Sequence, residues 1–275
     1  MRMGKLSDAI ERRQQETTVK TESLIRGRGN TATRENNQIF LAGKSSVGGA
    51  YSQKLVALTA PNSIDAENFK ILKTRILFPK DRQKPQTILV TSALPEEGKT
   101  FVAANLGVSI ALGVKEYVLL VDCDFRHPSL HNMLGYSNKQ GLHEYLTGKV
   151  ALPDVIIRTR VDKLSLLTAG SLPDNPPELL SSTLMEALLK QVKGRDENRF
   201  IIFDAPPSQL TAEAHVLANY VDGIIFVVRA TKSPREAIRK SIQTLGEEKI
   251  LGVVFNGYSE RSKSYGKYYK KYYRE

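Results

Sequence analysis

Five apolar segments alternate with helical stretches along this chain, and the alternation limits the fold more than any other feature. The apolar segments cover residues 87–90, 117–121, 200–203, 223–228 and 251–255. Helical patterns lie between them, notably at residues 99–112, 184–193, 212–219 and 234–245. Strands that are apolar throughout are buried on both faces, as in a parallel sheet that helices cover on each side. The sequence therefore predicts an α/β fold with a parallel sheet and helices on both faces.

A glycine-lysine-threonine sequence follows the first apolar segment and opens the first long helix. It ends the stretch Ala93-Leu-Pro-Glu-Glu-Gly-Lys-Thr100, and this order of strand, loop and helix is the context that a P-loop requires. Backbone N–H groups of such a loop bind phosphates. Lys99 is expected to reach the β- and γ-phosphates of ATP, and the Thr100 hydroxyl to bind Mg²⁺. The predicted nucleotide-binding residues are Pro95, Glu96, Glu97, Gly98, Lys99, Thr100 and Phe101.

Two positions depart from the usual P-loop pattern. Ala93 replaces its first glycine, and Glu96 occupies a position where glycine is common. A residue other than glycine costs roughly 1–2 kcal/mol when its φ angle is positive. A carboxylate beside a triphosphate is also repulsive unless it points to solvent. The hypothesis is that Glu96 weakens nucleotide binding moderately.

Acidic residues follow two of the apolar segments where the strands end. Asp122 and Asp124 come directly after residues 117–121, and Asp204 follows residues 200–203. Ligands of open parallel sheets bind beyond the carboxyl ends of the strands. Three carboxylates placed there beside a P-loop can bind a magnesium ion through its waters.

These motifs resemble those of the bacterial tyrosine autokinases of capsule and exopolysaccharide synthesis. The resemblance extends to Asn175-Pro-Pro-Glu-Leu-Leu180 and to a tyrosine-rich C-terminus, and covers residues 58–275. The polar composition of the first residues and the pattern of strands and helices predict a flexible arm (1–58), one domain (59–257) and a tail (258–275), and the resemblance implies that the domain is a P-loop kinase.

The resemblance also implies roles for the site residues. Thr100, Asp124 and Asp204 hold the metal, Lys99 and Asp124 serve catalysis, and Asp122 orients or deprotonates the acceptor phenol. The phenol has a pKa near 10, so a nearby carboxylate helps to remove its proton. Arg126 adds positive charge or pairs with an aspartate, and Asn256 contacts the adenine or forms a turn.

The C-terminal tail concentrates tyrosine and basic residues. Six of the eleven tyrosines lie in residues 258–275, and they alternate with lysines. Such a segment suits a solvated tail, a nucleic-acid contact or an anionic membrane surface. Because the phosphate-transfer motifs are in the same chain, we interpret it as a phosphoacceptor cluster. The predicted acceptors are Tyr265, Tyr268, Tyr269, Tyr272 and Tyr273.

A helix is expected to begin after Ser63, and one of its faces carries Glu67, Lys70 and Lys73. In the resembled family an acidic residue and two arginines at this spacing pack subunits into a ring. Both arginines are lysines here, which lack the bidentate guanidinium fork. We expect a homo-oligomeric ring, and a transmembrane chain-length regulator of polysaccharide synthesis as the membrane partner.

The net charge of +11 lies mostly in the two ends of the chain. Residues 1–50 carry nine Lys/Arg against five Asp/Glu, and residues 258–275 carry six against two. We therefore do not expect nucleic acid as a partner of the folded domain. One cysteine and no secretory or membrane-spanning segment predict a cytoplasmic protein that reaches the inner membrane through its partner.

Two other functions are compatible with a P-loop of this kind. A partitioning or septum-placement ATPase usually carries an extra lysine early in the loop, and none precedes Lys99 here. A non-enzymatic nucleotide-binding scaffold is the other alternative, with which the Glu96 departure is compatible.

Overall fold

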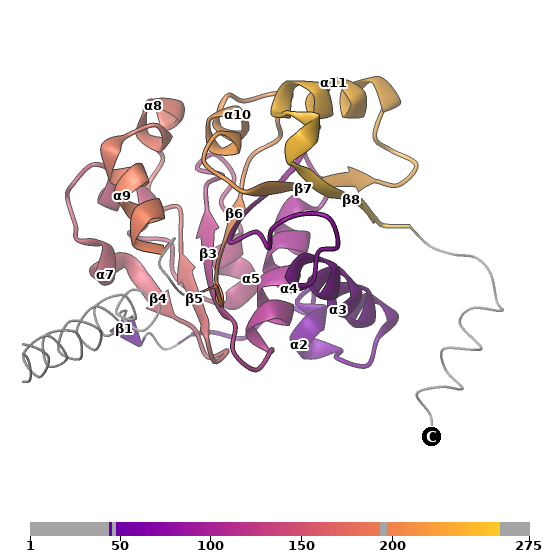
Figure 1. Cartoon of the computed structure of the whole chain (residues 1–275). Helices are drawn as coiled ribbons and strands as arrows, with labels where there is room; N and C mark the ends of the chain where they lie inside the picture. The colour runs from indigo at the N-terminus through magenta and orange to yellow at the C-terminus, as the bar shows by residue number, and fades with distance from the viewer. Residues whose placement is uncertain (1–43, 46–47, 193–196, 259–275) are drawn as a thin grey trace, which may run out of the picture. The chain divides into compact units, whose positions relative to one another are not determined.

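The strands of the computed structural model form one sheet, with the helices packed against it (Figure 1). The structure describes residues 44–45, 48–192 and 197–258, all within the unit of residues 39–275. The sheet order is β1-β4-β5-β3-β6-β2-β7-β8. The strands are β1 (Lys44–Ser45), β2 (Thr87–Ser92), β3 (Tyr117–Asp122), β4 (Ile156–Arg158), β5 (Leu164–Leu167), β6 (Arg199–Asp204), β7 (Gly223–Arg229) and β8 (Ile250–Asn256).

The predicted α/β fold is confirmed, and each of the five apolar segments is a strand of the sheet. These strands, β2, β3, β6, β7 and β8, run parallel to one another. One edge differs from the all-parallel prediction, because β4 runs antiparallel to β5. Both strands were missed because they are only three and four residues long.

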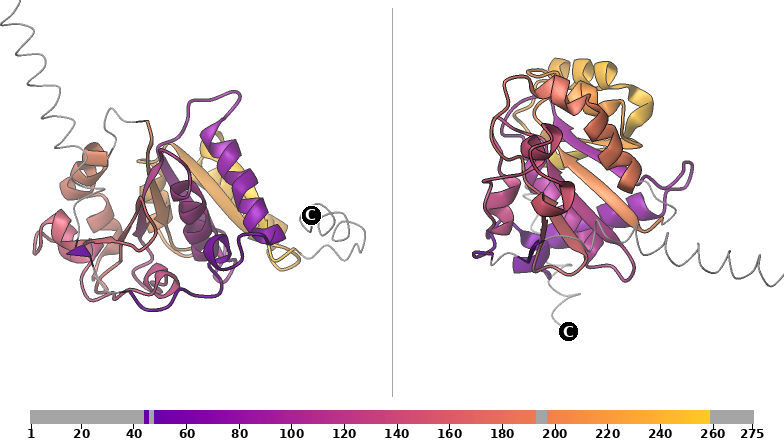
Figure 2. Two further views of the ribbon diagram at one scale, coloured as in Figure 1. Left: turned by 90° about the horizontal axis from the view of Figure 1, so that it is seen from below. Right: turned by 90° about the vertical axis from the view of Figure 1, so that its left-hand side faces the viewer.

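Helices cover both faces of the sheet, as expected (Figure 2). One face carries α2 (Val56–Thr59), α3 (Ile64–Leu77), α4 (Lys99–Ala111) and α5 (Leu130–Leu134). The other carries α6 (Leu142–Leu146), α7 (Leu152–Val155), α8 (Pro176–Leu180), α9 (Thr183–Val192), α10 (Glu213–Ala218) and α11 (Arg235–Leu245).

The strands are apolar throughout because their side chains serve both of these layers. In β6, Phe200 and Ile202 pack into the core beneath α4, whereas Ile201 and Phe203 pack into the core beneath α9 and α10. Successive side chains of a strand point to opposite faces, so a sheet covered on both sides needs apolar residues at every position.

Helix α4 lies at the centre of its layer and is buried from Val102 to Ala111. Its polar residue Asn105 is satisfied within the core. The Asn105 side chain accepts from the Ala57 N–H at 3.0 Å and donates to the carbonyl oxygens of Lys54 and Phe101 at 3.0 and 2.9 Å. A buried amide with its partners in place does not destabilise the core.

Packing against the domain begins before residue 59, where the sequence analysis placed the end of the arm. The Gly49 N–H donates to the Gly135 carbonyl at 2.7 Å, the Ser52 N–H donates to the Met133 carbonyl at 3.0 Å, and Leu55 is fully buried. The N-cap prediction for α3 is confirmed, since the Ser63 hydroxyl accepts from the Ala66 N–H at 3.1 Å. Residues 1–43 of the predicted arm lie outside the described residues.

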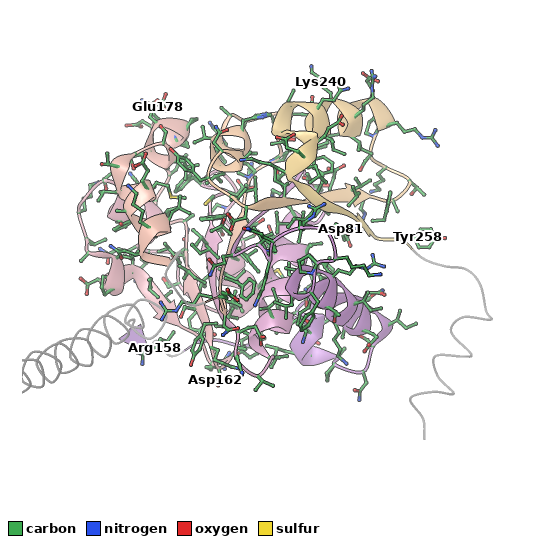
Figure 3. The ribbon with its side chains drawn as sticks, viewed as in Figure 1. Asp81, Arg158, Asp162, Glu178, Lys240 and Tyr258 are labelled. Carbon is green, nitrogen blue, oxygen red and sulfur yellow. The ribbon has the colours of Figure 1, made fainter. Side chains whose placement is uncertain are left out.

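Strand β8 forms one edge of the sheet and leads to Tyr258, the last described residue. Tyr258 lies beyond the end of β8, apart from the helices (Figure 3), and is 69% exposed. The five predicted phosphoacceptor tyrosines follow it, outside the described residues. Within the described part of the chain, every helix is too short or too polar to span a bilayer.

Candidate functional site

The loop between β2 and α4 has the backbone conformation of a phosphate-binding turn. Glu96 and Gly98 both have positive φ angles, of 60° and 94°. At Gly98 a side chain is unfavourable, because φ is positive and because a Cβ atom there would lie 1.9 Å from the amide nitrogen of Asn256, which would have to move. Helix α4 begins at the next residue, so its N-terminal N–H groups face the loop.

The Glu97 side chain points into the protein and fixes the loop through hydrogen bonds of its carboxylate. It is 3% exposed, accepts from the Leu94 N–H at 2.9 Å and accepts a second hydrogen bond from the Ser233 hydroxyl. The Asn256 amide donates to the main-chain oxygen of Glu97 at 2.9 Å. The loop is therefore anchored both to the segment after β7 and to the end of β8.

Lys99 lies among the three predicted carboxylates. Its Nζ atom is 2.8 Å from Oδ2 of Asp124. Asp122 and Asp204 are the last residues of the neighbouring strands β3 and β6, and they lie next to each other in the register of the sheet. Burial lowers the pKa of Lys99, but the charges of Asp204 and Asp124 outweigh this and raise the pKa above its usual value. The lysine therefore stays a cation, as phosphate binding requires.

Asp122 holds the segment that follows β3. Its Oδ2 accepts from the N–H groups of Ser129 and Leu130 at 3.0 and 3.1 Å, and its Oδ1 accepts from the Asp124 N–H at 3.2 Å. It is fully buried, and burial, reinforced by the charge of Asp204, raises its pKa well above the usual value. In this structure the side chain orients the loop that carries Asp124.

Asp204 is buried, and neither carboxylate oxygen has a hydrogen bond of ordinary geometry, although the Thr100 hydroxyl lies close enough to lower its pKa. Burial raises its pKa to about 6, although the charge of Lys99 opposes the shift. An unsatisfied buried carboxylate beside a P-loop fits the second coordination shell of a hydrated Mg²⁺ ion. Among the described residues, no group of three or more His, Cys, Asp or Glu side chains could hold a metal ion by itself. Phosphate oxygens and waters would have to complete the coordination of such an ion.

A cavity of about 790 Å³ opens in front of the loop, and it contains several of the predicted site residues. Pro95, Glu96, Gly98, Lys99, Thr100 and Asp124 line it. Arg126, His127 and Ser129 also line it, and the residues after β6 form a further wall of Pro206, Pro207, Leu210 and Thr211, which the sequence analysis did not include. The only signal for this wall was the Pro-Pro pair after Asp204.

The predicted nucleotide contacts Phe101 and Asn256 lie on the other side of the loop. Both line a separate groove of about 430 Å³ between α3 and the end of β8. The Phe101 ring packs edge-on against Phe69, with centroids 5.5 Å apart. The structure therefore has the cavity on one side of the P-loop and the groove on the other.

Two further predictions concern charged pairs. Arg126 pairs with the buried Glu213 at 3.7 Å instead of with an aspartate. On α3, Lys70 pairs with Glu67 at 3.0 Å. Lys73 lies one turn further on. Whether this face joins subunits stays a prediction.

A lysine, a helix N-terminus and carboxylates at the ends of parallel strands define a P-loop nucleotide-binding protein. Residues 88–274 match the family model of the CobQ/CobB/MinD/ParA nucleotide binding domain. The chain is 34% identical over 212 residues to the tyrosine-protein kinase YwqD of Bacillus subtilis (strain 168), covering 76% of this chain and 88% of that protein.

Two solved structures align over most of the chain. The kinase domain of the Escherichia coli tyrosine kinase ETK aligns with a TM-score of 0.71 and 30% identity, over 80% of this chain and 84% of that chain. The chimerical protein CapA2B2 aligns with a TM-score of 0.70 and 29% identity, over 82% of this chain and 100% of that chain. The chain belongs to the bacterial tyrosine-protein kinase family.

Proposed function

We propose that this tyrosine kinase uses ATP and Mg²⁺ to phosphorylate the tyrosines of its own C-terminal tail, and thereby regulates polysaccharide polymerisation or export. The observation that carries the proposal is the convergence of Lys99, Asp124 and Asp204 at the N-terminus of α4. This arrangement suits a triphosphate better than any other ligand, because it combines anion-binding N–H groups, a cation and carboxylates for a hydrated metal ion.

The chain's own residues have distinct tasks in this reaction. The N–H groups of α4 and the Lys99 ammonium bind the β- and γ-phosphates, and the Thr100 hydroxyl, Asp124 and Asp204 hold the hydrated ion. When bound, magnesium would neutralise charge between the β- and γ-phosphates. The phenol oxygen forms a bond to the γ-phosphorus, the bond between that phosphorus and the ADP oxygen breaks, and the phenol proton passes to the Asp124 carboxylate and from there to water.

The geometry favours an orienting role for Asp122 over direct deprotonation. All of its hydrogen-bond contacts with backbone N–H groups run to residues 124–130, and it does not line the cavity. Asp124 does line it, so Asp124 is the carboxylate positioned to meet the phenol. Removing the Asp122 side chain would displace the loop that carries Asp124.

Phosphorylation of the tail would reverse its charge. The tail carries six Lys/Arg against two Asp/Glu, and each phosphate adds about −1.5 to −2 charges at pH 7, so about three phosphates suffice. We propose that the subunits form a ring through the α3 face of Glu67, Lys70 and Lys73, in which one tail enters a neighbour's site. A transmembrane chain-length regulator would then bring the ring to the inner membrane.

Incubation of the purified chain with labelled ATP and Mg²⁺, followed by mass spectrometry, tests the proposal. We expect phosphotyrosine at residues 265–273. A variant with Tyr265, Tyr268, Tyr269, Tyr272 and Tyr273 replaced by phenylalanine is the matched control, and it should bind ATP with unchanged affinity. Release of free phosphate alone would instead indicate a partitioning-type ATPase, and absence of any turnover would indicate a scaffold.

A further inference from the structure

The cavity wall formed by the residues after β6 is mostly apolar, with Thr211 as its polar member, and it includes an exposed leucine. Leu210 lies between β6 and α10, is 62% exposed, and shares the wall with Pro206 and Pro207. A single exposed leucine on a protein surface needs no explanation. A cavity that combines such a leucine at its rim with charged groups at its floor has the composition of a ligand site, in which apolar walls surround a few polar groups.

The wall is held in place by hydrogen bonds to the strand that carries the P-loop. The Thr91 hydroxyl donates to the Pro206 carbonyl at 2.8 Å, the Ser208 N–H donates to the Ser92 carbonyl at 2.9 Å, and the Gln209 N–H donates to the Ala93 carbonyl at 3.3 Å. These contacts keep the wall and the P-loop at a constant separation. Leu210 is therefore presented to the cavity by a fixed loop.

The position of the wall relative to a bound triphosphate follows from the charges. Lys99 is drawn toward Asp124 and Asp204, at the ends of β3 and β6, and a P-loop lysine contacts the β- and γ-phosphates. The γ-phosphate therefore lies on this side of the loop. The separate groove beside Asn256 leaves room for the nucleoside on the other side. An acceptor must approach the γ-phosphorus in line, from the side away from ADP.

We propose that Leu210, Pro206 and Pro207 bind the aromatic ring of the acceptor tyrosine. The ring packs on this wall, and its hydroxyl then reaches the γ-phosphate beside Asp124. The same contact explains selection of tyrosine over serine, because a serine side chain has no ring to cover the wall and its shorter reach leaves the hydroxyl away from the phosphate. This inference rests on the proposed function and adds the residues that recognise the acceptor.

Acceptor kinetics of the full chain test this assignment. A synthetic peptide of residues 258–275 serves as acceptor, with labelled ATP and Mg²⁺. We expect Leu210→Ala to raise the KM for the peptide roughly tenfold, the loss that follows from uncovering a large part of a leucine side chain. Leu210→Met, which keeps the apolar volume, should retain the parent KM. Leu172, which is 60% exposed and lies outside the cavity lining, supplies the control Leu172→Ala.

The affinity for a fluorescent ATP analogue separates this inference from the proposed function. It should stay unchanged in Leu210→Ala, because the wall contacts the acceptor and not the nucleotide. An unchanged peptide KM in Leu210→Ala would overturn the inference and leave the proposed function standing. A parallel loss of nucleotide affinity would also overturn it, by assigning the wall to the base of ATP. Failure of the parent chain to phosphorylate any tyrosine would overturn the proposed function itself, and the acceptor site with it.

Discussion

The side-chain amide of Asn256 donates to the main-chain oxygen of Glu97, 2.9 Å away and 159 residues earlier in the sequence. This hydrogen bond joins the end of β8 to the P-loop. We expect Asn256→Ala to weaken ATP binding by loosening the loop, and the net contribution of such a bond, about 1 kcal/mol, corresponds to roughly a fivefold increase in Kd.

Inorganic tripolyphosphate distinguishes this role from a contact with adenine. If Asn256 acts through the loop, its replacement should weaken tripolyphosphate and ATP binding to the same extent, as isothermal titration calorimetry can measure. A loss confined to ATP would show that the amide contacts the base instead.

Glu96 has a φ angle of 60°, which is unfavourable for any residue other than glycine. We expect Glu96→Gly to raise the free energy of unfolding by about 1 kcal/mol and to lower the Kd for ATP by removing a carboxylate from the cavity. Glu96→Gln removes the charge alone, so it should lower the Kd without the gain in stability. Chemical denaturation and nucleotide titration measure the two effects. Unchanged or weaker ATP binding in the glycine variant would count against the hypothesis.

Above its pKa of about 6, Asp204 carries a fully buried charge, and the Lys99 charge and the Thr100 hydroxyl only partly offset the effect of burial. In EDTA at pH 8 we expect Asp204→Asn to raise the free energy of unfolding by about 1–3 kcal/mol, because it removes a buried charge. A raised pKa means that the folded parent binds the proton more tightly than the unfolded chain does. The free energy of unfolding of the parent should therefore decrease as the pH rises from about 4 to about 6. The asparagine variant should not show this decrease. Urea denaturation at pH 5 and pH 8 measures it, and a less stable variant at pH 8 would contradict the account.

Glu144 shows the opposite pH dependence, far from the P-loop. Burial raises its pKa, but hydrogen bonds from Ser171 and from the Gly141 N–H outweigh this and lower the pKa below 4.5. Its stabilisation is thus present above about pH 4.5 and lost as the pH falls through the folded-state pKa. At pH 7 we expect Glu144→Gln to lower the free energy of unfolding by about 1–3 kcal/mol. Exposed Glu178 supplies the control Glu178→Gln, and equal losses in both variants would refute this role.

The sequence predicted those parts of the fold that depend on long apolar runs. Residues 200–203 were recognised as a strand because all four are apolar, and β6 extends them by one residue at each end. Strand β4 was missed because its three residues end in an exposed arginine, and Leu55 was missed because a single buried leucine has no periodicity.

Within the site, the sequence located chemistry better than orientation. Lys99 and Asp124 were expected together because strand ends meet at one edge of a sheet, and the structure places them 2.8 Å apart. The inward direction of Glu97 could not be predicted, because its partner Ser233 is distant in the sequence. Leu210 was missed for the same reason, since the contacts that hold its loop connect different strands.

Replacement of Lys99 tests the central claim, that one cation and three carboxylates converge on a bound triphosphate. In Lys99→Ala we expect the Kd for ATP·Mg²⁺ to rise at least about tenfold, since a charge-assisted contact to phosphate is lost, and tail phosphotyrosine to disappear from the mass spectrum. Lys240, an exposed lysine on α11 (Figure 3), supplies the control Lys240→Ala, which should match the parent in both. Parent-like ATP affinity together with a fully phosphorylated tail in Lys99→Ala would contradict the account.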